Sequence, residues 1–158
     1  MNERIDTKVS ASVFITDKAN RLLLINIDRN GDLKWSPPGG GMVAHENPLT
    51  TAIREAKEET GFDVELKNLI GIYTVDRGEI TGIGFVFRDK IIGGSARLEV
   101  SDDKVMEYKY FTDSEIDDLI NNALIFRPNE YNLQAIKDWR DGKSFSLGVV
   151  RPLFFKLN

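Results

Sequence analysis

The stretch at residues 40–62 reads GGMVAHENPLTTAIREAKEETGF and joins a glycine-rich loop to a helix. Asn47 is a good N-cap residue, Pro48 suits the first helical position and Gly61 suits the C-terminal stop. Between them, apolar residues recur at helical spacing, at Leu49, Ala52, Ile53 and Ala56. These signals predict an α-helix over residues 47–60, with those four side chains on one face.

Three carboxylates share another face of this helix. Glu55, Glu58 and Glu59 stand at i, i+3 and i+4, within a sector of roughly 100°, and the apolar face is centred about 120° away. Like charges at this spacing repel one another, and a bound divalent cation would turn the repulsion into attraction. The glycines at 39–41 let the backbone approach a ligand closely and offer a carbonyl oxygen as a further ligand. These residues indicate a metal-assisted reaction on a phosphate group.

The composition restricts which metal such a site could hold. The chain has 158 residues, with 25 acidic and 21 basic side chains (net charge −4), one histidine and no cysteine. Thiolate catalysis, disulfides, cysteine-ligated zinc and histidine-rich metal sites are therefore excluded. Oxygen ligands remain, and they favour Mg²⁺, Mn²⁺ or Ca²⁺.

The chain on either side of this stretch predicts an α/β fold, with a single domain over residues 1–158. Strands are expected at residues 9–16 and 21–27, joined as a hairpin by the turn at 17–20, and again at 62–75, 83–92 and 104–111. Further helices are expected from Thr112 or Ser114 onward and after Pro128. Strands on both sides of the first helix predict a mixed sheet covered by helices.

Charge and hydropathy exclude two classes of partner. The mild acidity argues against a nonspecific nucleic-acid binder, because such proteins usually carry a basic stripe. Residues 1–6 are polar where a secretion signal would be apolar, and no apolar run is long enough to cross a bilayer. We therefore expect a cytoplasmic protein with neither a membrane nor a nucleic acid as partner.

The spacing of the fixed residues resembles a known family signature. Gly40, five residues, Glu46, seven residues and then REAKEETGF at 54–62 match the box G-x5-E-x7-R-E-U-x-E-E-x-G-U of the Nudix hydrolases, in which U is bulky and aliphatic or similar. Ala56 is small and Phe62 is aromatic for their U positions. The resemblance implies a Nudix-type α/β/α sandwich with a central mixed β-sheet.

The resemblance also implies roles for the matching residues. Glu58 and Glu59 would ligate Mg²⁺ or Mn²⁺, often together with Glu55 and the carbonyl of Gly40. Arg54 would orient these carboxylates through charge-assisted hydrogen bonds. The implied reaction is hydrolysis of a diphosphate linkage in a nucleoside diphosphate derivative, in which a carboxylate base activates the attacking water.

The identity of that base stays open between two residues. Glu107 begins the segment EYKYF, which resembles the family's common E-x-x-W-F segment, and it is the preferred candidate. Glu55 is the alternative. Glu46 is expected to support the loop, whose shape should differ from that of many members because Val43 and His45 replace their glutamate and glycine.

Candidate substrate contacts lie outside the signature. Arg29 and Trp35 could meet a phosphate and a base, and Lys34 and Arg77 could meet outer phosphates. Asn129, in FRPNE at 126–130, is similarly placed to the asparagine with which oxidised-guanine-nucleotide hydrolases read a purine.

Substrate hypotheses follow from the same resemblance. A nucleoside triphosphate such as a damaged purine nucleotide is the first hypothesis, and a nucleotide sugar is the second. A Nudix domain that binds a nucleotide without cleaving it is an alternative of another class. The expected partner is a small-molecule nucleotide, and a homodimer stays open because dimers are common in the family.

Overall fold

The computed structural model describes residues 6–29, 31–97, 104–125 and 129–153, without the side chains of residues 29, 104, 129 and 130. Its strands form two sheets. The first has the order β4-β1-β6-β5, from β4 (Gly39–Gly41), β1 (Asp6–Phe14), β6 (Ile80–Gly94) and β5 (Phe62–Asp76). The second has the order β3-β2-β7, from β3 (Asp32–Ser36), β2 (Leu22–Arg29) and β7 (Lys104–Phe111).

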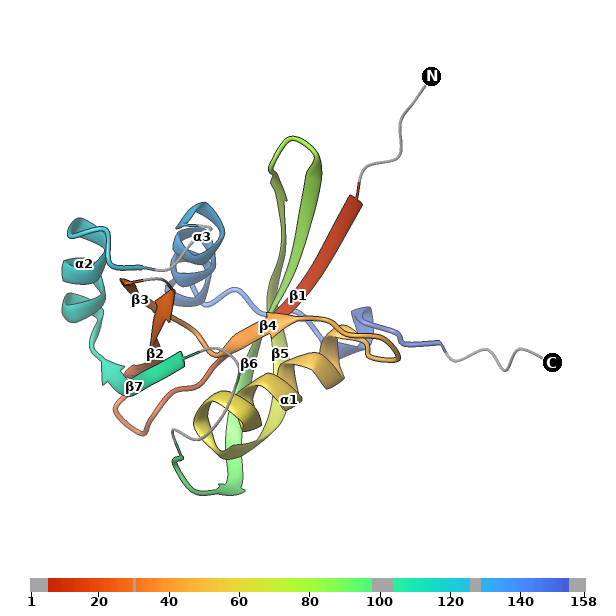
Figure 1. Ribbon diagram of the computed structural model, residues 1–158. Coiled ribbons are helices and arrows are strands. Elements are labelled where there is room, and N and C mark those ends of the chain that lie inside the picture. The colour runs from red at the N-terminus through yellow and green to blue at the C-terminus, as the bar shows by residue number, and fades with distance from the viewer. Residues whose placement is uncertain (1–5, 30, 98–103, 126–128, 154–158) are drawn as a thin grey trace.

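The first sheet is mixed and lies between helices, as predicted. Its strand β1 runs parallel to β6 and antiparallel to β4. Helix α1 (Pro48–Thr60) lies on one side of the molecule, and α2 (Asp113–Asn121) and α3 (Asn129–Arg140) lie on the other (Figure 1). The short helix η1 (Leu147–Val149) follows α3. Two hydrophobic clusters fill the layers, one with Ala52 and Ala56 of α1 and one with Ile116 of α2 and Ile136 of α3.

The predicted hairpin of the first two strands forms only next to its turn. Thr16 and Leu22 make an antiparallel bridge, and the amide of Leu23 donates to the carbonyl of Ile15 at 2.8 Å, but β1 and β2 then separate into different sheets. The turn itself is retained, because Asp17 accepts hydrogen bonds from the backbone amides of Ala19 and Arg21. The loop before α1 contains the short strands β3 and β4, which the sequence analysis did not predict.

Helix α1 begins and ends where its capping residues predict. The Asn47 side chain accepts hydrogen bonds from the amides of Leu49 and Thr50, and Gly61 ends the helix with a φ of 79°. The buried face differs from the expectation, however. Ile53 is 41% exposed, while Glu59 is only 1% exposed, so an acidic residue lies on the inner side of the helix.

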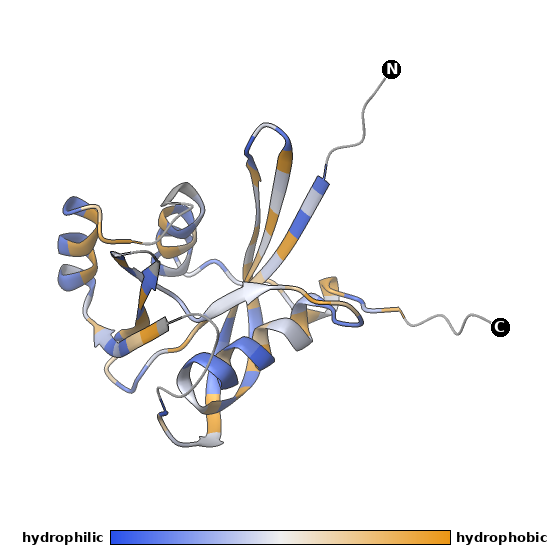
Figure 2. Cartoon of the chain, viewed as in Figure 1, coloured by the Kyte–Doolittle hydropathy of each residue, from blue (hydrophilic) through white to orange (hydrophobic). Residues whose placement is uncertain are grey.

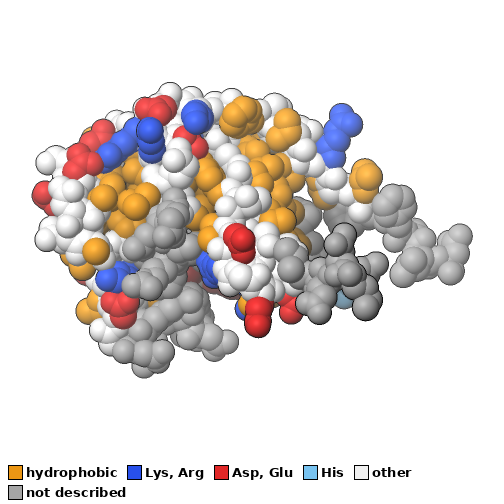
Figure 3. Space-filling view, turned by 90° about the horizontal axis from the view of Figure 1, so that it is seen from above, with side chains coloured by type: hydrophobic (Ala, Val, Ile, Leu, Met, Phe, Trp, Pro, Cys, Tyr) orange, Lys and Arg blue, Asp and Glu red, His pale blue; other side chains and the backbone are white. Residues whose placement is uncertain are grey.

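The surface of the described chain is mixed in character. Hydrophilic and hydrophobic residues alternate along α1 and along the strands (Figure 2). Seen from above, hydrophobic side chains gather toward the middle of the face, and most charged side chains lie toward its margins (Figure 3). No helix in the described part of the chain combines the length and the apolar character needed to cross a membrane.

Candidate active site

Arg54 of α1 connects three carboxylates and the glycine loop. Its Nε donates to Glu46 Oε1 at 2.6 Å, and its Nη1 donates to Glu55 Oε1 at 2.8 Å and to Glu58 Oε2 at 2.9 Å. Its Nη2 donates to the carbonyl of Gly41 at 3.1 Å. One guanidinium therefore bonds two acidic side chains of the helix, Glu55 and Glu58, and joins them to Glu46 and to β4.

Hydrogen bonds between Arg54 and the glutamates stabilise the ionised forms of Glu46 and Arg54. Hydrogen bonding by Arg54, aided by Thr51, lowers the pKa of Glu46 to about 2. The same bond to Glu46, with those to Glu55 and Glu58, raises the pKa of Arg54 above its usual range. Glu46 Oε2 also accepts from the amide of Val43 at 3.3 Å, so this carboxylate ties the loop to the helix.

Two close contacts place β4 directly against the acidic residues. Glu59 Oε2 accepts a hydrogen bond from the amide of Gly39 at 2.7 Å. A Cβ added to Gly40 would meet the carboxylate of Glu55, so a side chain at this position would displace that carboxylate. The structure thus brings Gly40, Glu55, Glu58 and Glu59 into one site, as the family signature implies.

The donor set at this site fits a hard divalent cation. Every candidate ligand is an oxygen, the side chain of Glu58 is 45% exposed to solvent, and no side chain separates Gly40 from Glu55. Within the described residues, no three acidic or histidine side chains already converge as a metal-binding group. Arg54 engages the carboxylates of Glu55 and Glu58.

A cleft of about 350 Å³ opens beside the glycine loop. It is lined by β1, by β4, by the start of β6 and by residues from the β2–β3 region and α3. Tyr131 forms one wall, since its hydroxyl lies 3.2 Å from Ser12 Oγ and its ring occupies the space where a Cβ on Gly84 would lie. The lining residues are Lys8, Val9, Ser10, Ala11, Ser12, Ile27, Ser36, Pro37, Gly39, Gly40, Gly41, Arg77, Ile80, Gly82, Tyr131 and Asn132.

The structure does not bring Glu107 together with the carboxylates of α1. Glu107 is exposed and accepts a hydrogen bond from Asn26 Nδ2 at 3.4 Å. Its neighbour Tyr108 packs in the cluster that contains Ala52 of α1. Because successive side chains of a strand point to opposite faces, Glu107 points away from α1.

The predicted substrate contacts have different outcomes. Trp35 packs edge-on against Phe111 with ring centroids 4.7 Å apart, and it is not among the described residues that line the cleft. Lys34 donates to the carbonyl of Ala123 at 2.7 Å, whereas Arg77 does line the cleft. The side chains of Arg29 and Asn129 lie outside the described residues.

The sequence analysis did not predict that the polar side chains of β1, Ser10 and Ser12, line a cleft. Ser10 and Ser12 alternate with Val9, Ala11 and Val13 in a predicted strand, so period-two reading places both serines on one face. That alternation was the available signal, but the partner of this face, Tyr131 on α3, is 119 residues from Ser12.

Comparison with known proteins agrees with this geometry. A NUDIX domain model matches residues 6–132. An ADP-ribose pyrophosphatase of Methanocaldococcus jannaschii is 31% identical over 134 residues, which cover 81% of this chain and 72% of that protein. A MutT-like protein of Streptomyces ambofaciens is 39% identical over 90 residues, which cover 56% of this chain and about half, 55%, of that protein's length.

A solved structure also shares the fold. The NUDIX hydrolase from Nitrosomonas europaea superposes with a TM-score of 0.82 at 22% identity, over 94% of this chain and 98% of that one. The match at residues 6–132 includes the whole Arg54 network and the glycine loop beside it. A family match of this extent, on the residues that build the site, establishes that the chain belongs to the Nudix family.

Proposed function

We propose that this protein hydrolyses a diphosphate linkage in a nucleoside diphosphate derivative, with Mg²⁺ or Mn²⁺ as cofactor. The observation that carries the proposal is the Arg54 network, which presents oriented carboxylates against Gly40 at the edge of a cleft. The relative named as an ADP-ribose pyrophosphatase supports a phosphoric anhydride as the bond that is broken.

The acidic residues of α1 and the glycine loop would hold the cation. Glu55, Glu58, Glu59 and the Gly40 carbonyl supply oxygen donors of the type that Mg²⁺ and Mn²⁺ prefer. When bound, the cation supplies positive charge that stabilises the diphosphate oxygens as the bond breaks. Arg54 bonds to Glu55 and Glu58, which limits the motion of these two carboxylates beside the glycine loop.

Glu55 is the base that this arrangement favours. Its carboxylate is fixed by Arg54 and lies against Gly40, where a diphosphate would be bound beside the loop. From that position it can accept the proton of an attacking water. Glu107, the candidate preferred from the sequence, is exposed on the far face of β7 and is therefore the weaker candidate.

The cleft would hold the group attached to the diphosphate. A damaged purine nucleotide is the first substrate hypothesis, and a nucleotide sugar is the second. The hydroxyls of Ser10, Ser12 and Tyr131 favour the second, because they can exchange hydrogen bonds with sugar hydroxyls. A small-molecule nucleotide is the proposed partner, while a cytoplasmic location and a homodimer remain predictions.

The test is a panel of nucleoside triphosphates, nucleotide sugars and dinucleotides, assayed for phosphate or nucleotide release with and without Mg²⁺. We expect turnover only with divalent cation, and a loss of about 10²-fold or more in kcat for Glu55→Gln and for the combined Glu58→Gln and Glu59→Gln variant. Calorimetric binding of the substrate to each variant separates lost chemistry from lost binding.

Glu107→Gln is the matched control, since it makes the same chemical change on the opposite face of β7. A loss of kcat for Glu107→Gln that equals the loss for Glu55→Gln would return the base to Glu107. Tight nucleotide binding without turnover of any compound would instead identify a non-catalytic nucleotide sensor and overturn the proposal.

A further inference from the structure

The outer end of the cleft carries two basic side chains, Lys8 and Arg77. Lys8 belongs to β1, and Arg77 belongs to the turn between β5 and β6, where its amide donates to the carbonyl of Ile80 at 3.0 Å. Both line the cleft. Neither makes a side-chain hydrogen bond or an ion pair within the part of the chain that the structure describes.

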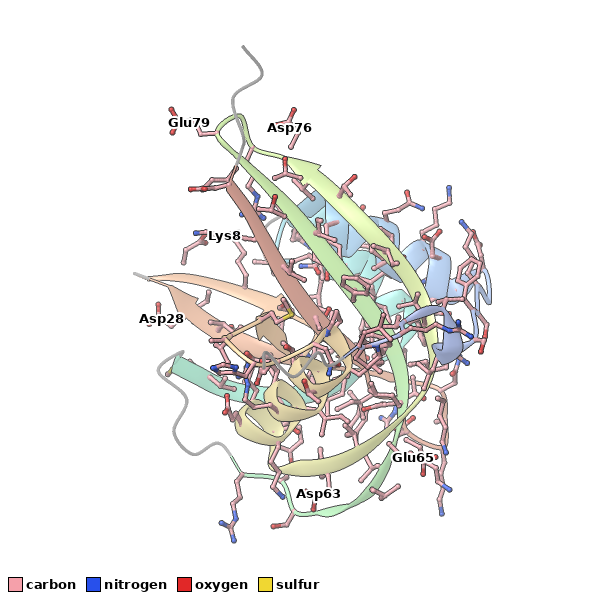
Figure 4. All side chains as sticks on the ribbon, turned by 90° about the vertical axis from the view of Figure 1, so that its right-hand side faces the viewer. Lys8, Asp28, Asp63, Glu65, Asp76 and Glu79 are labelled. Carbon is pink, nitrogen blue, oxygen red and sulfur yellow. The ribbon has the colours of Figure 1, made fainter. Side chains whose placement is uncertain are left out.

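Several other basic residues of the described chain form ion pairs with acidic residues. Arg54 pairs with glutamates of the active site, Lys34 with Asp32 and Lys143 with Asp138. Figure 4 shows Lys8 projecting from β1 on the side of Asp28, and the acidic residues of the β5–β6 hairpin at its tip. Within the described residues, Asp76 and Glu79 of that tip form no ion pair with Lys8 or Arg77, so both cations are available to a ligand.

The register of the sheet fixes where this charge lies relative to the active site. Gly40 pairs with Ala11 on β1, and Lys8 lies three residues earlier on the same strand, roughly 10 Å away at the usual rise of a strand. Lys8 pairs with Gly82 of β6, where an added Cβ would meet nothing nearer than 3.7 Å. Gly82 therefore adds no side chain beside Lys8, and Ser10, which lies on β1 between Lys8 and Ala11, also lines the cleft.

The lining of the cleft favours a phosphate over an unmodified base at this end. A guanidinium and an ammonium bind phosphate oxygens through charge-assisted hydrogen bonds, whereas a neutral base gains little from them. Tyr131 is the only aromatic residue among those described as lining the cleft, and its ring is packed against Gly84 rather than offered for stacking.

We infer that Lys8 and Arg77 form a second anion-binding site, which selects diphosphate compounds that carry an additional phosphate monoester. This inference rests on the proposed function, because it takes the diphosphate to lie beside Gly40. It narrows the substrate class to a nucleoside diphosphate derivative with a phosphorylated ribose or other phosphorylated group.

The experiment compares matched compounds that differ only by one phosphate: NADP⁺ with NAD⁺, coenzyme A with dephospho-coenzyme A, and ADP-ribose 2′-phosphate with ADP-ribose. In at least one pair we expect kcat/KM to be about tenfold higher or more for the phosphorylated member, the size of effect that one charge-assisted contact gives. The preference should decrease as salt is added. Combined Lys8→Gln and Arg77→Gln substitution should bring the ratio close to one, and combined Lys8→Arg and Arg77→Lys substitution should retain it.

Lys18→Gln is the control, because Lys18 is an exposed cation in the turn after β1 and does not belong to the cleft lining. It should leave the ratio unchanged. Equal hydrolysis of both members in every pair would overturn the second site while leaving the proposed activity in place.

Binding measured by calorimetry separates the two proposals. If no compound is hydrolysed but the phosphorylated member binds more tightly and loses this advantage in the double glutamine variant, the second site is supported and the proposed activity fails. A preference that survives the double glutamine variant would overturn the second site.

Discussion

Glu46 beside α1 and Asp89 on β6 are both carboxylates shielded from solvent, and their surroundings shift their pKa values in opposite directions. Glu46 accepts hydrogen bonds from Arg54, Thr51 and the amide of Val43, and its pKa falls to about 2. Asp89 is 7% exposed, and no neighbouring residue in the described ranges donates a hydrogen bond to it. Burial, only partly opposed by its own backbone amide, raises the pKa of Asp89 to about 7.

The difference shows that partners decide the charge of a shielded carboxylate. At α1 the charge is stabilised before any ligand arrives, because a guanidinium is built into the same helix. On β6 the ionised form is penalised, because nothing compensates its lost hydration. The first environment suits a site that must hold negative charge, and the second does not.

The largest expected effect comes from removing the partner at α1. Arg54→Gln should lower kcat by about 10²-fold, because the carboxylates lose the group that orients them. It should also destabilise the fold by about 2–4 kcal/mol and raise the pKa of Glu46, since partly buried carboxylates are left without their cation. Steady-state kinetics and urea unfolding measure the two losses.

Arg140→Gln provides the matched control for this variant. The Arg140 side chain has the same exposed fraction as Arg54, 27%, and bonds to Asp113 and Asp117, which are mostly exposed. We expect it to cost about 1 kcal/mol or less and to leave kcat unchanged. Similar losses in both variants would mean that the Arg54 network has no special role.

Asp89→Asn should change stability without the large loss of kcat expected for Arg54→Gln, and its effect should depend on pH. The carboxyl has a pKa of about 7 in the folded protein against a reference of 3.8, so the folded state binds the extra proton between these values. Wild-type stability should therefore fall as pH rises from about 4 to 7, and the asparagine variant should avoid that loss. We expect Asp89→Asn to be more stable by about 2–4 kcal/mol at pH 8, with a gain that shrinks toward pH 4.

Urea unfolding of both proteins at pH 5 and pH 8 measures this difference. Asp138→Asn is the control of opposite sign, since Asp138 is equally buried but bonds to Tyr73, Gln134 and Lys143, which outweigh burial and lower its pKa. It should destabilise the protein at pH 8. Destabilisation by Asp89→Asn at pH 8 would contradict the account of Asp89.

The smallest effect is expected at His45, next to Glu46 in the loop. His45 has a φ of 69°, a left-handed conformation that costs a residue with a Cβ and not glycine. His45→Gly should raise stability by about 1 kcal/mol or less without altering the Glu46 bonds, and thermal unfolding would detect the shift. Asn20→Gly, at a φ of 58°, is the control and should raise stability by less, because asparagine tolerates this region. A loss of stability in His45→Gly would contradict the proposal that His45 is strained.

Local signals predicted α1 well, and non-local pairing explains what was missed. The N-cap at Asn47 and the stop at Gly61 depend on neighbours within a few residues, so the sequence contains them. The separation of β1 from β2 depends on β6 and β7, which come much later in the chain. The glycine run of β4 has no strand propensity of its own and becomes a strand by pairing with β1.

In the candidate site, too, local spacing could be predicted from the sequence and non-local pairing could not. The residues of the signature, from Gly40 to Glu59, were predictable because their spacing is fixed within one loop and one helix. The placement of Glu107 was not, because it depends on which face of β7 packs toward α1, and that is set by pairing with β2, whose Asn26 lies 81 residues earlier in the chain. The inward side of Glu59 was set by the position of β4 over the helix.

Strand β1 contributes side chains both to the core beneath the active site and to the lining of the cleft. Its side chains at Ala11 and Val13 pack with α1, while Lys8, Ser10 and Ser12 alternate with them and line the cleft. Under the proposed function, substitutions at Lys8 and Ser10 would change which compound is accepted and would leave Val13, which packs in the cluster with α1, in place. Such a strand would give the domain a short evolutionary route to new substrates.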